Sequence, residues 1–394
     1  MVFSRKKKRR VVVIIETTRA YSREVIRGIA RYNREHGDWM VEFSPRGLED
    51  HSSLWLKDWR ADGIFARINS TTFMETILET GIPTIDLRRT ILHPKIPQIG
   101  PDDRKVTELL FHHFRQLGFL SFGFLGVRAE PHTSMAIRRK SFAELVKKEK
   151  LQYSQLIVSD VMDNTYRLSA RKRNMYMRIR KWLQELPPQT AIVGCNDDMA
   201  FRILEECRSL GIAIPDTFAI AGIGNDECFC ELGHPSMTSV DLNPQRIGYE
   251  AAVLLEKLMR GEKVPHASYV EPWGVVPRVS SDTVATDDEA ITIALQFIRE
   301  HACEEIGIRD VLDQVHLSRV SLEKRFKKFL GRTIYQEIMR LRLDHVRKLL
   351  ATTQMSHKQI AREAGFRYQE YMMRVFRQMT GMTLKKYRET NRIT

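Results

Sequence analysis

The 394-residue sequence lacks the features of membrane-spanning and secreted proteins. No apolar run reaches the roughly 18 residues that a bilayer-spanning helix needs, and Val11–Ile15 is too short for the core of a signal peptide. The five cysteines follow no repeated spacing, and Cys228-x-Cys230 has no second cysteine pair to complete a zinc site. We therefore expect reduced thiols, no zinc site and a cytoplasmic protein.

Motifs typical of enzymes are absent as well. The sequence contains no Walker lysine motif, no H-E-x-x-H and no G-x-S-x-G. Gly118, Gly123 and Gly126 do not follow the dinucleotide-binding spacing, and the pair His112-His113 on a predicted helix is more typical of packed or exposed residues than of a metal site. We predict that the protein is not an enzyme and needs no cofactor or metal.

Positive charge is concentrated at the two ends of the chain. Of the net charge of +14, Arg5–Arg10 carries +6, and residues 287–394 carry 21 Lys and Arg against 14 Asp and Glu. The residues between these ends are close to neutral. Basic ends on a neutral body favour contact with the phosphates of a nucleic acid, although the N-terminal tail, residues 1–10, could also be simply solvated.

The last hundred residues contain one pattern twice. Residues 308–331 and 356–381 each begin with a short amphipathic helix, continue through a tight turn and end in a longer basic helix. Phe326 and Phe376 hold equivalent positions in the two longer helices, and Gly331 and Gly381 are expected to end these helices as C-caps. This is the helix-turn-helix pattern, whose second helix fits the major groove of DNA. We predict a DNA-binding domain over residues 287–394 that reads two grooves.

Helical spacing sorts the residues of this domain. The inward positions of the two longer helices are Leu322, Phe326 and Leu330, and Met372, Phe376 and Met379. The expected helix caps are Ser318 for the first longer helix and Asp287 or Asp288 for a helix that runs to about Cys303. A further helix from Thr333 to about Ala351, roughly 28 Å long at 1.5 Å per residue, is expected to join the two copies.

This arrangement resembles the DNA-binding domain of AraC/XylS-type regulators. The resemblance implies a double-stranded DNA operator as partner and four base-reading residues in each copy, namely Val320, Ser321, Glu323 and Lys324, and Gln369, Glu370, Tyr371 and Arg374. Lysine and arginine suit guanine, glutamine suits adenine, and glutamate accepts from cytosine. Phosphate contacts, which position the protein without specifying sequence, are predicted for Arg325, Lys327, Lys328, Arg377 and Lys385.

Short apolar runs alternate with amphipathic helices before this domain. Val11–Ile15 is a strand candidate, and the helix that follows over Arg23–Glu35 places Val25 and Ile29 on one face. About a dozen such elements precede residue 240, which is more than one sheet usually holds. The pattern predicts an α/β body of two lobes with parallel sheets, and a ligand at the carboxyl ends of the strands.

The body resembles the periplasmic-binding-protein-like sensors of lactose-repressor-type regulators. The passages VVVIIETTRAYSREVIRGIARYNREHGDW, RADGIFARI and GYEAAVLLEKLMRGEKVP are similar to those of xylose-type sugar-operon regulators. Only ten residues precede the first strand, so the DNA-reading part must follow the body. We predict a tail at 1–10, a sensor at 11–280, a linker at 281–286 and an all-α domain with two helix-turn-helix motifs at 287–394.

Family position implies the residues that contact a ligand. Loops after strands supply Thr18, Arg19, Arg88 and Arg89 in the first lobe. The second lobe supplies Ser134 and Arg138, which match a Ser-x-x-x-Arg-x-x-x-Phe pattern, together with Asn196, Asp197, Asn225 and Asp226. Arginine and aspartate offer paired donors and acceptors to vicinal hydroxyls. The alternatives are that Asn196 caps a helix and that Arg138 is a surface charge.

Two positions depart from the family pattern. Gly224 stands where sugar-binding relatives usually carry an aspartate, and Leu242 stands where they often carry a polar amide. A sugar hydroxyl left unpaired in a closed site costs about 1–3 kcal/mol. These departures disfavour xylose as the effector and leave another sugar, or an apolar or anionic small molecule, open.

The sequence therefore predicts a transcription regulator gated by a small molecule, most simply a sugar. Family habit adds a homodimer and contact with RNA polymerase. Two alternatives stay open, a sugar-binding protein or sugar-handling enzyme without a DNA role, and an architectural DNA-binding protein whose body binds no ligand.

Overall fold

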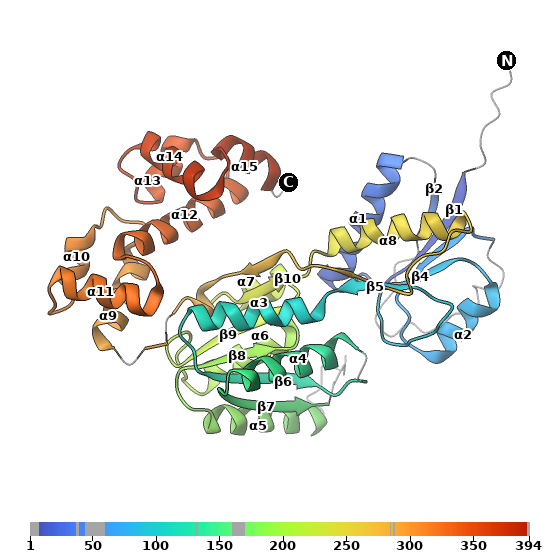
Figure 1. Ribbon diagram of the computed structural model, residues 1–394, viewed down its shortest axis with the longest axis horizontal. Coiled ribbons are helices and arrows are strands. Elements are labelled where there is room, and N and C mark those ends of the chain that lie inside the picture. The colour runs from blue at the N-terminus through green and yellow to red at the C-terminus, as the bar shows by residue number, and fades with distance from the viewer. Residues whose placement is uncertain are drawn as a thin grey trace, which may run out of the picture. The chain divides into compact units, whose positions relative to one another are not determined.

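The computed structural model describes residues 8–36, 39–43, 60–130, 133–159, 170–283, 285–286 and 288–391. The chain divides into two compact units (Figure 1), residues 1–115 with 119–282, and residues 116–118 with 283–394. None of the helices among the described residues has the length and apolarity needed to span a membrane.

The first unit contains two six-stranded sheets, one in each lobe (Figure 1). The first sheet has the order β11-β5-β4-β3-β1-β2, with the strands β1 (Arg9–Ile14), β2 (Trp39–Phe43), β3 (Gly63–Ala66), β4 (Thr84–Asp86), β5 (Gln98–Pro101) and β11 (Ala267–Val270). The second has the order β12-β10-β9-β8-β6-β7, with β6 (Ser121–Val127), β7 (Gln152–Val158), β8 (Thr190–Gly194), β9 (Phe218–Ile223), β10 (Thr238–Asp241) and β12 (Gly274–Val276). Among the described residues, all strand pairings are parallel except that of β12 with β10.

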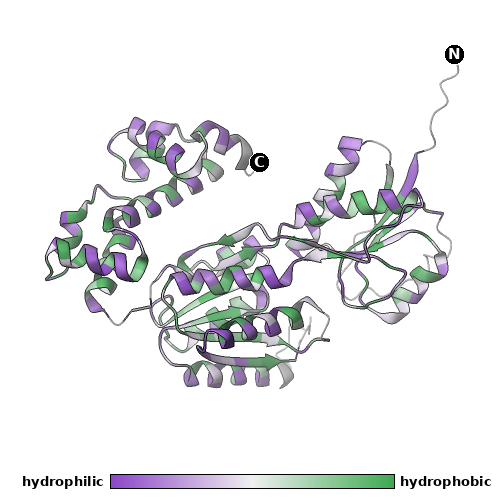
Figure 2. Cartoon of the chain, in the orientation of Figure 1, coloured by the Kyte–Doolittle hydropathy of each residue, from purple (hydrophilic) through white to green (hydrophobic). Residues whose placement is uncertain are grey.

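Helices bury both faces of the first sheet. Val11, Val13 and Ile15 lie in one apolar cluster, together with residues of α1 and α8, whereas Val12 and Ile14 lie in another, with residues of α2. The inner strands β1 and β3 are accordingly mostly hydrophobic after the two arginines that begin β1, while the helices carry polar outer faces (Figure 2). The helices of this unit are α1 (Ala20–His36), α2 (Thr71–Thr80), α3 (Asp103–Gln116), α4 (Ser134–Lys148), α5 (Ala170–Glu185), α6 (Asp197–Ser209), α7 (Glu227–Leu232) and α8 (Pro244–Met259).

The two predicted lobes with largely parallel sheets are therefore confirmed. The sequence did not indicate that residues 244–270 return to the first lobe, where α8 packs on α1 and β11 extends the sheet beside β5. The N-terminal prediction also needs correction. Because β1 begins at Arg9, two of the six basic tail residues belong to the sheet, and Arg9 pairs with Glu256 at 2.7 Å. Residues 1–7 of the predicted tail lie outside the described residues.

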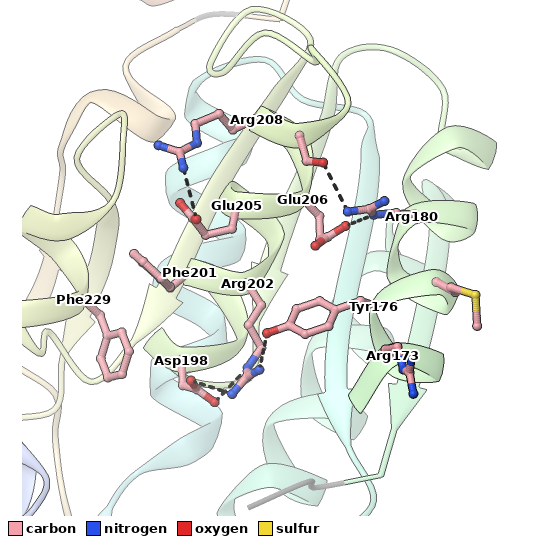
Figure 3. A pocket seen from close by; sticks show the side chains of 12 residues that line it. Arg173, Tyr176, Arg180, Asp198, Phe201, Arg202, Glu205, Glu206, Arg208 and Phe229 are labelled. Atoms are coloured by element: carbon pink, nitrogen blue, oxygen red, sulfur yellow. Dashed lines mark hydrogen bonds and ion pairs between the residues drawn. The ribbon is translucent and has the colours of Figure 1, made fainter. Parts of the chain in front are cut away.

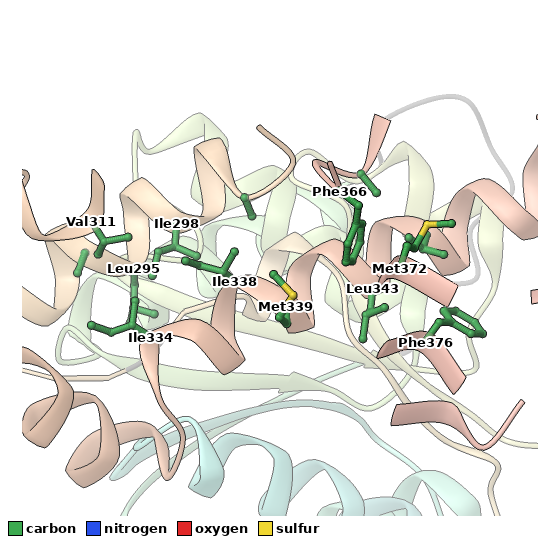
Figure 4. Packing of buried hydrophobic residues seen from close by; sticks show 14 of the residues in the cluster. Leu295, Ile298, Val311, Ile334, Ile338, Met339, Leu343, Phe366, Met372 and Phe376 are labelled. Carbon is green, nitrogen blue, oxygen red and sulfur yellow. The ribbon is translucent and has the colours of Figure 1, made fainter. Parts of the chain in front are cut away.

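The second unit is all helical. Its helices are α9 (Glu289–His301), α10 (Ile308–Leu312), α11 (Arg319–Leu330), α12 (Ile334–Thr352), α13 (His357–Glu363), α14 (Gln369–Thr380) and α15 (Leu384–Asn391). The two helix-turn-helix motifs are α10–α11 and α13–α14. Residues of both motifs and of α12 form one buried cluster, in which Ile334 and Ile338 lie toward Val311 and Leu295 while Leu343 lies toward Phe376 (Figure 4).

Several local predictions for this unit are confirmed. Ser318 caps α11 by accepting from the Ser321 N–H at 3.3 Å, and Asp288 caps α9. Gly331 and Gly381 end α11 and α14 in the left-handed conformation, with φ of 67° and 70°. Asp287, the other predicted cap, lies outside the described residues.

One predicted core residue is wrong. Met379 is 60% exposed, not buried. The first copy buries Leu330, four residues after Phe326, and the matching position in the second copy is Thr380. The Thr380 hydroxyl donates to the Phe376 carbonyl at 2.7 Å, so this face of α14 ends one residue later than we predicted.

Gly28 and Gly248 allow α1 and α8 to approach closely. A Cβ atom at Gly28 would lie 2.0 Å from the Gln245 carbonyl oxygen, and one at Gly248 would lie 2.0 Å from the Val25 carbonyl oxygen. Both obstacles are backbone atoms, which cannot move aside as a side chain can.

We predict that Gly28→Ala lowers the free energy of unfolding by about 1–3 kcal/mol, because it forces the two helices apart. Helix propensity alone predicts the opposite sign, a gain of up to about 1 kcal/mol. Urea denaturation of the variant, with the exposed Arg27→Ala on the same helix as control, decides between them. A stabilised Gly28→Ala protein would contradict the close approach.

Candidate nucleic-acid interface and ligand site

The exposed face of α11 carries part of the predicted base-reading set. Val320 is 78% exposed and Lys324 is also exposed, whereas Ser321 and Glu323 are half-buried. The Glu323 carboxylate accepts from the Ile334 N–H at 3.4 Å and so helps to cap α12. Val320 and Lys324 are therefore the members of this set that the fold leaves most accessible.

The exposed face of α14 carries the second set. Glu370 and Arg374 are exposed and Gln369 is half-buried. The Tyr371 ring lies under the Arg374 guanidinium, 5.2 Å from ring centroid to Cζ, and its hydroxyl hydrogen-bonds to that of Tyr335 on α12. Tyr371 thus packs within the domain and holds Arg374 outward.

Four of the five predicted phosphate contacts, Lys327, Lys328, Arg377 and Lys385, are exposed. Arg325 differs from them. Its Nη1 donates to both carboxylate oxygens of Asp288, at 2.9 and 2.8 Å, and Asp288 is the residue that caps α9. The guanidinium of Arg325 is therefore engaged by the Asp288 carboxylate.

The two motifs are held together by the turn at residues 302–306 and by α12. Arg342 of α12 donates to the backbone carbonyls of Ala302, Glu304 and Ile306, at 2.6, 2.6 and 3.0 Å. Its guanidinium also lies 5.8 Å from the ring centre of Phe366, in the turn of the second motif. Sequence reasoning missed Arg342, although a buried arginine in the middle of a joining helix is an unusual feature.

In the first unit, the predicted ligand residues of the first lobe lie at one edge of its sheet. Thr18 and Arg19 follow β1, and Arg88 and Arg89 follow β4. Buried Asp86 shapes the second of these loops by accepting from the N–H groups of Ile68, Arg88 and Arg89, at 3.1, 2.9 and 3.0 Å. Burial raises the pKa of Asp86, and these three hydrogen bonds oppose that rise.

An ion pair that the sequence analysis missed adjoins these loops. Arg67, directly after β3, donates to the Glu16 carboxylate at 2.9 Å and to the Ser22 hydroxyl at 2.7 Å. Its guanidinium lies 5.4 Å from the centre of the Tyr21 ring. Ligand residues lie at the carboxyl ends of parallel strands, which is why the loop after β4 was selected. The same rule applies to Arg67.

A buried ion triad joins the two lobes. Asp103, at the start of α3, pairs with Arg138 of α4 at 2.7 Å and with Arg89 of the first lobe at 3.4 Å. Arg138 also donates to the Cys195 carbonyl at 2.9 Å. The structure therefore places two predicted ligand residues, Arg89 and Arg138, in a structural ion network, and the surface-charge alternative for Arg138 is wrong because its side chain is 4% exposed. Ser134, one turn earlier on α4, is half-buried.

The remaining residues of the second lobe form a hydrogen-bonded set. Asn196 caps α6 by accepting from the Met199 N–H at 2.8 Å, which was the alternative reading of this residue. Asp197 accepts from the Asp226 N–H at 2.8 Å and from the Ser239 hydroxyl at 2.5 Å. Asn225, at φ 50°, accepts from Arg278 and donates to Asp241.

Asp197 explains the glycine at position 224. A Cβ atom on Gly224, which has φ 139°, would lie 2.7 Å from the Asp197 Oδ2 atom. An aspartate at this position would therefore collide with Asp197 as the loop stands. Burial raises the pKa of Asp197 to about 6, against the hydrogen bonds from Asp226 and Ser239. At the other departure, Leu242 is 4% exposed and offers no polar group.

Asp226 reaches across the two lobes. Its carboxylate caps α7 by accepting from the Cys228 N–H at 3.2 Å, and it accepts from the Ala20 N–H at 3.4 Å. Ala20 is the first residue of α1, so a second-lobe carboxylate lies at the positive end of a first-lobe helix.

A separate pocket of about 990 Å³ lies on the second lobe along α5, α6 and α7. Its arginines are largely paired, Arg202 with Asp198 and Tyr176, and Arg208 with Glu205 (Figure 3). None of the predicted ligand residues lines this pocket. Among the described residues, no group of three or more His, Cys, Asp and Glu side chains could hold a metal ion.

Comparison with known proteins places these two units in a recognised order. Residues 111–281 match the family described as periplasmic binding protein-like domain, and residues 311–390 match the helix-turn-helix domain family. The xylose operon regulatory protein of Escherichia coli K12 is 30% identical, over 98% of each chain. That of Haemophilus influenzae is 29% identical, over 96% of this chain and 98% of its own. A solved structure of a xylose-binding transcription activator aligns with a TM-score of 0.65 and 28% identity, over 98% of this chain and 100% of the other.

The raised pKa of Asp197 predicts a pH dependence of stability. Because the folded state prefers the protonated carboxyl, stability is greatest below the ordinary pKa of 3.8 and falls as pH rises toward about 6, by roughly 2–3 kcal/mol in total. Asp197→Asn cannot ionise, so we expect the melting temperature of the natural protein minus that of the variant to decrease between pH 4 and about pH 7. Asp198→Asn, the adjacent half-buried residue, controls for the loss of one charge. A difference that stays level or grows with pH contradicts the prediction.

Proposed function

The chain belongs to the family of the xylose operon regulatory proteins and is a DNA-binding transcription regulator. We propose that a sugar or sugar derivative binds between its two lobes, and that this binding controls how α11 and α14 contact an operator. The residues that we propose for DNA and ligand are those predicted from the sequence, weighted by their exposure. Val320, Lys324, Gln369, Glu370 and Arg374 read bases, and exposed lysines and arginines beside them contact phosphates.

The observation that carries this proposal is the single core of the second unit. Both helix-turn-helix motifs share one buried cluster with α12, so their two recognition helices move as one body. At 19 residues, α12 is about 28 Å long, and successive major grooves on one face of DNA are about 34 Å apart. One chain can therefore present α11 and α14 to neighbouring turns of a duplex.

We also propose how the protein works in the cell. Operators read by regulators of this kind are direct repeats or palindromes, which two copies of the chain would occupy as a homodimer. A regulator of transcription acts in the cytoplasm, where it meets its operator and RNA polymerase. The relatives are regulators and give no support to a sugar-handling enzyme or a sugar-binding protein without a DNA role.

The first test is binding to DNA. Duplexes enriched from a random pool by the full chain should share a bipartite motif, and Arg374→Ala should weaken binding to them by about 1–3 kcal/mol while relaxing preference at one base pair. Fluorescence anisotropy with single-base variants of the enriched duplex measures both effects. Arg246→Ala, an exposed arginine on α8, controls for the loss of one charge. An equal loss on every duplex would make Arg374 a phosphate contact, and no enrichment at all would refute DNA binding.

The pair of Arg325 with Asp288 gives a second prediction. Asp288→Asn keeps the cap of α9, because asparagine caps as well as aspartate, but removes the charge that holds Arg325. If Arg325 then reaches a phosphate, affinity should rise about threefold to tenfold, and the slope of log affinity against log salt should steepen by about 0.9. Binding measured over a salt series tests this. Arg325→Gln should abolish the gain in the double variant, and an unchanged slope would show that Arg325 touches no phosphate.

A further inference from the structure

Three arginines gather at the carboxyl edge of the first sheet. Arg19, Arg67 and Arg88 follow β1, β3 and β4, which are adjacent in the sheet order β4-β3-β1. Parallel strands end at the same edge, so their loops bring these three side chains together. Their proximity has an electrostatic consequence: the pKa of Arg88 is lowered by burial and then by the like charges of Arg67 and Arg19.

Two carboxylates, Glu16 and Asp86, lie near the three arginines and oppose the lowering of the Arg88 pKa, but neither forms an ion pair with Arg88 among the described residues. Glu16 is engaged by Arg67 and by the Ser22 hydroxyl. The oxygens of Asp86 accept from three backbone N–H groups and from the side-chain amide of Gln98. Within the described part of the chain, the side chain of Arg88 has one hydrogen bond, from Nε to the Thr90 hydroxyl at 3.0 Å, and no ion pair. A half-buried guanidinium is thus left with its two terminal nitrogens unengaged.

Arg67 also retains an unused donor. Its Nε is buried and has no hydrogen-bond partner among the described residues, although Nη1 pairs with Glu16 and Ser22. A buried donor without an acceptor is unfavourable, so such groups in folded proteins normally meet a partner or a ligand. Two neighbouring guanidinium groups therefore present free donors at one place.

Among the described residues, the acidic residues of the second lobe form no ion pair with Arg67 or Arg88 and are engaged by other groups. Asp197 bonds to Ser239 and to the Asp226 N–H, Asp241 bonds to Asn225 and to the Asn243 N–H, and Asp226 caps α7. Asp103 is shared by Arg89 and Arg138. Among the described residues, the guanidinium of Arg88 therefore has no carboxylate of this chain as an ion-pair partner.

We propose that the effector is a sugar-derived anion, whose carboxylate or phosphate group is bound by Arg88 together with the free edge of Arg67. The planar guanidinium of arginine matches both anions with paired N–H donors, and the low local dielectric strengthens such charge-assisted bonds. This proposal rests on the proposed function, because it names the chemical class of the ligand held between the lobes. It predicts discrimination against neutral sugars of the same shape.

Titration calorimetry with the full chain tests the proposal through matched pairs of compounds. D-xylonate is compared with D-xylose, and D-gluconate and D-glucose 6-phosphate are compared with D-glucose. We expect at least one anion to bind roughly tenfold or more tightly than its neutral partner, and the carboxylate and phosphate arms identify which anion the site takes. Arg88→Gln should remove that advantage and Arg88→Lys should restore part of it, while Arg246→Gln on α8 should keep it. Melting temperatures without ligand establish that each variant folds.

Three results would overturn the anion site. These are equal affinity for anionic and neutral partners, an anion preference that survives in Arg88→Gln, and no binding of any anion in the panel. Binding to the enriched duplex is measured on the same samples. If the protein binds the duplex but none of the anions, the proposed ligand class is wrong and the proposed DNA-binding function is unaffected. If the protein binds an anion but no duplex, the proposed DNA-binding function is wrong and the proposed anion site is retained.

Discussion

The second unit depends on one buried side chain, that of Arg342. Its guanidinium donates to three carbonyls in the turn between α9 and α10 and packs beside Phe366 of the second motif. The same turn leaves no room at Gly365, where a Cβ atom would lie 2.7 Å from backbone atoms of Cys303 and Glu304. The carbonyls at the end of a helix carry partial negative charge, so a cation there satisfies them and the helix dipole together. The turn at residues 302–306 thus connects the two helix-turn-helix motifs through its contacts with Arg342 and Gly365.

A comparable joint exists in the sensor. Asp103 binds Arg89 from one lobe and Arg138 from the other, at positions where the three side chains are almost fully buried. An ion network of this kind adds little net stability, because desolvation offsets much of the attraction, but removing one member leaves an uncompensated buried charge. Its value lies in specifying one arrangement of the lobes. Arg138, predicted as a ligand contact, keeps at most part of its guanidinium for a ligand once it serves Asp103 and Cys195.

Prediction from the sequence succeeded where the determinants are local. The caps at Ser318 and Asp288, the glycines that end α11 and α14, and the length of α12 follow from residues within one or two turns. The return of α8 and β11 to the first lobe could not be predicted, because it depends on pairing between segments more than 150 residues apart. The same limit applies to the site. Asp197 was selected for its motif, but its burial against Gly222 and Gly224 depends on contacts between strands that are distant in the sequence. Arg67 lies within the RADGIFARI passage, but nothing in that passage marked it as a ligand residue.

Gating requires a ligand that favours one lobe arrangement, since equal affinity for both shifts nothing. The first turn of α1 links occupancy to arrangement. The N–H of Ala20, its first residue, donates to Asp226 of the second lobe, and the loop that leads into it, residues 15–19, carries Glu16 and Arg19 of the arginine-rich edge. A ligand bound at this edge therefore lies beside the N-terminus of α1, which also contacts Asp226 of the second lobe. A neutral ligand would leave the repulsion between Arg67 and Arg88 in place, whereas an anion bound to both would offset it.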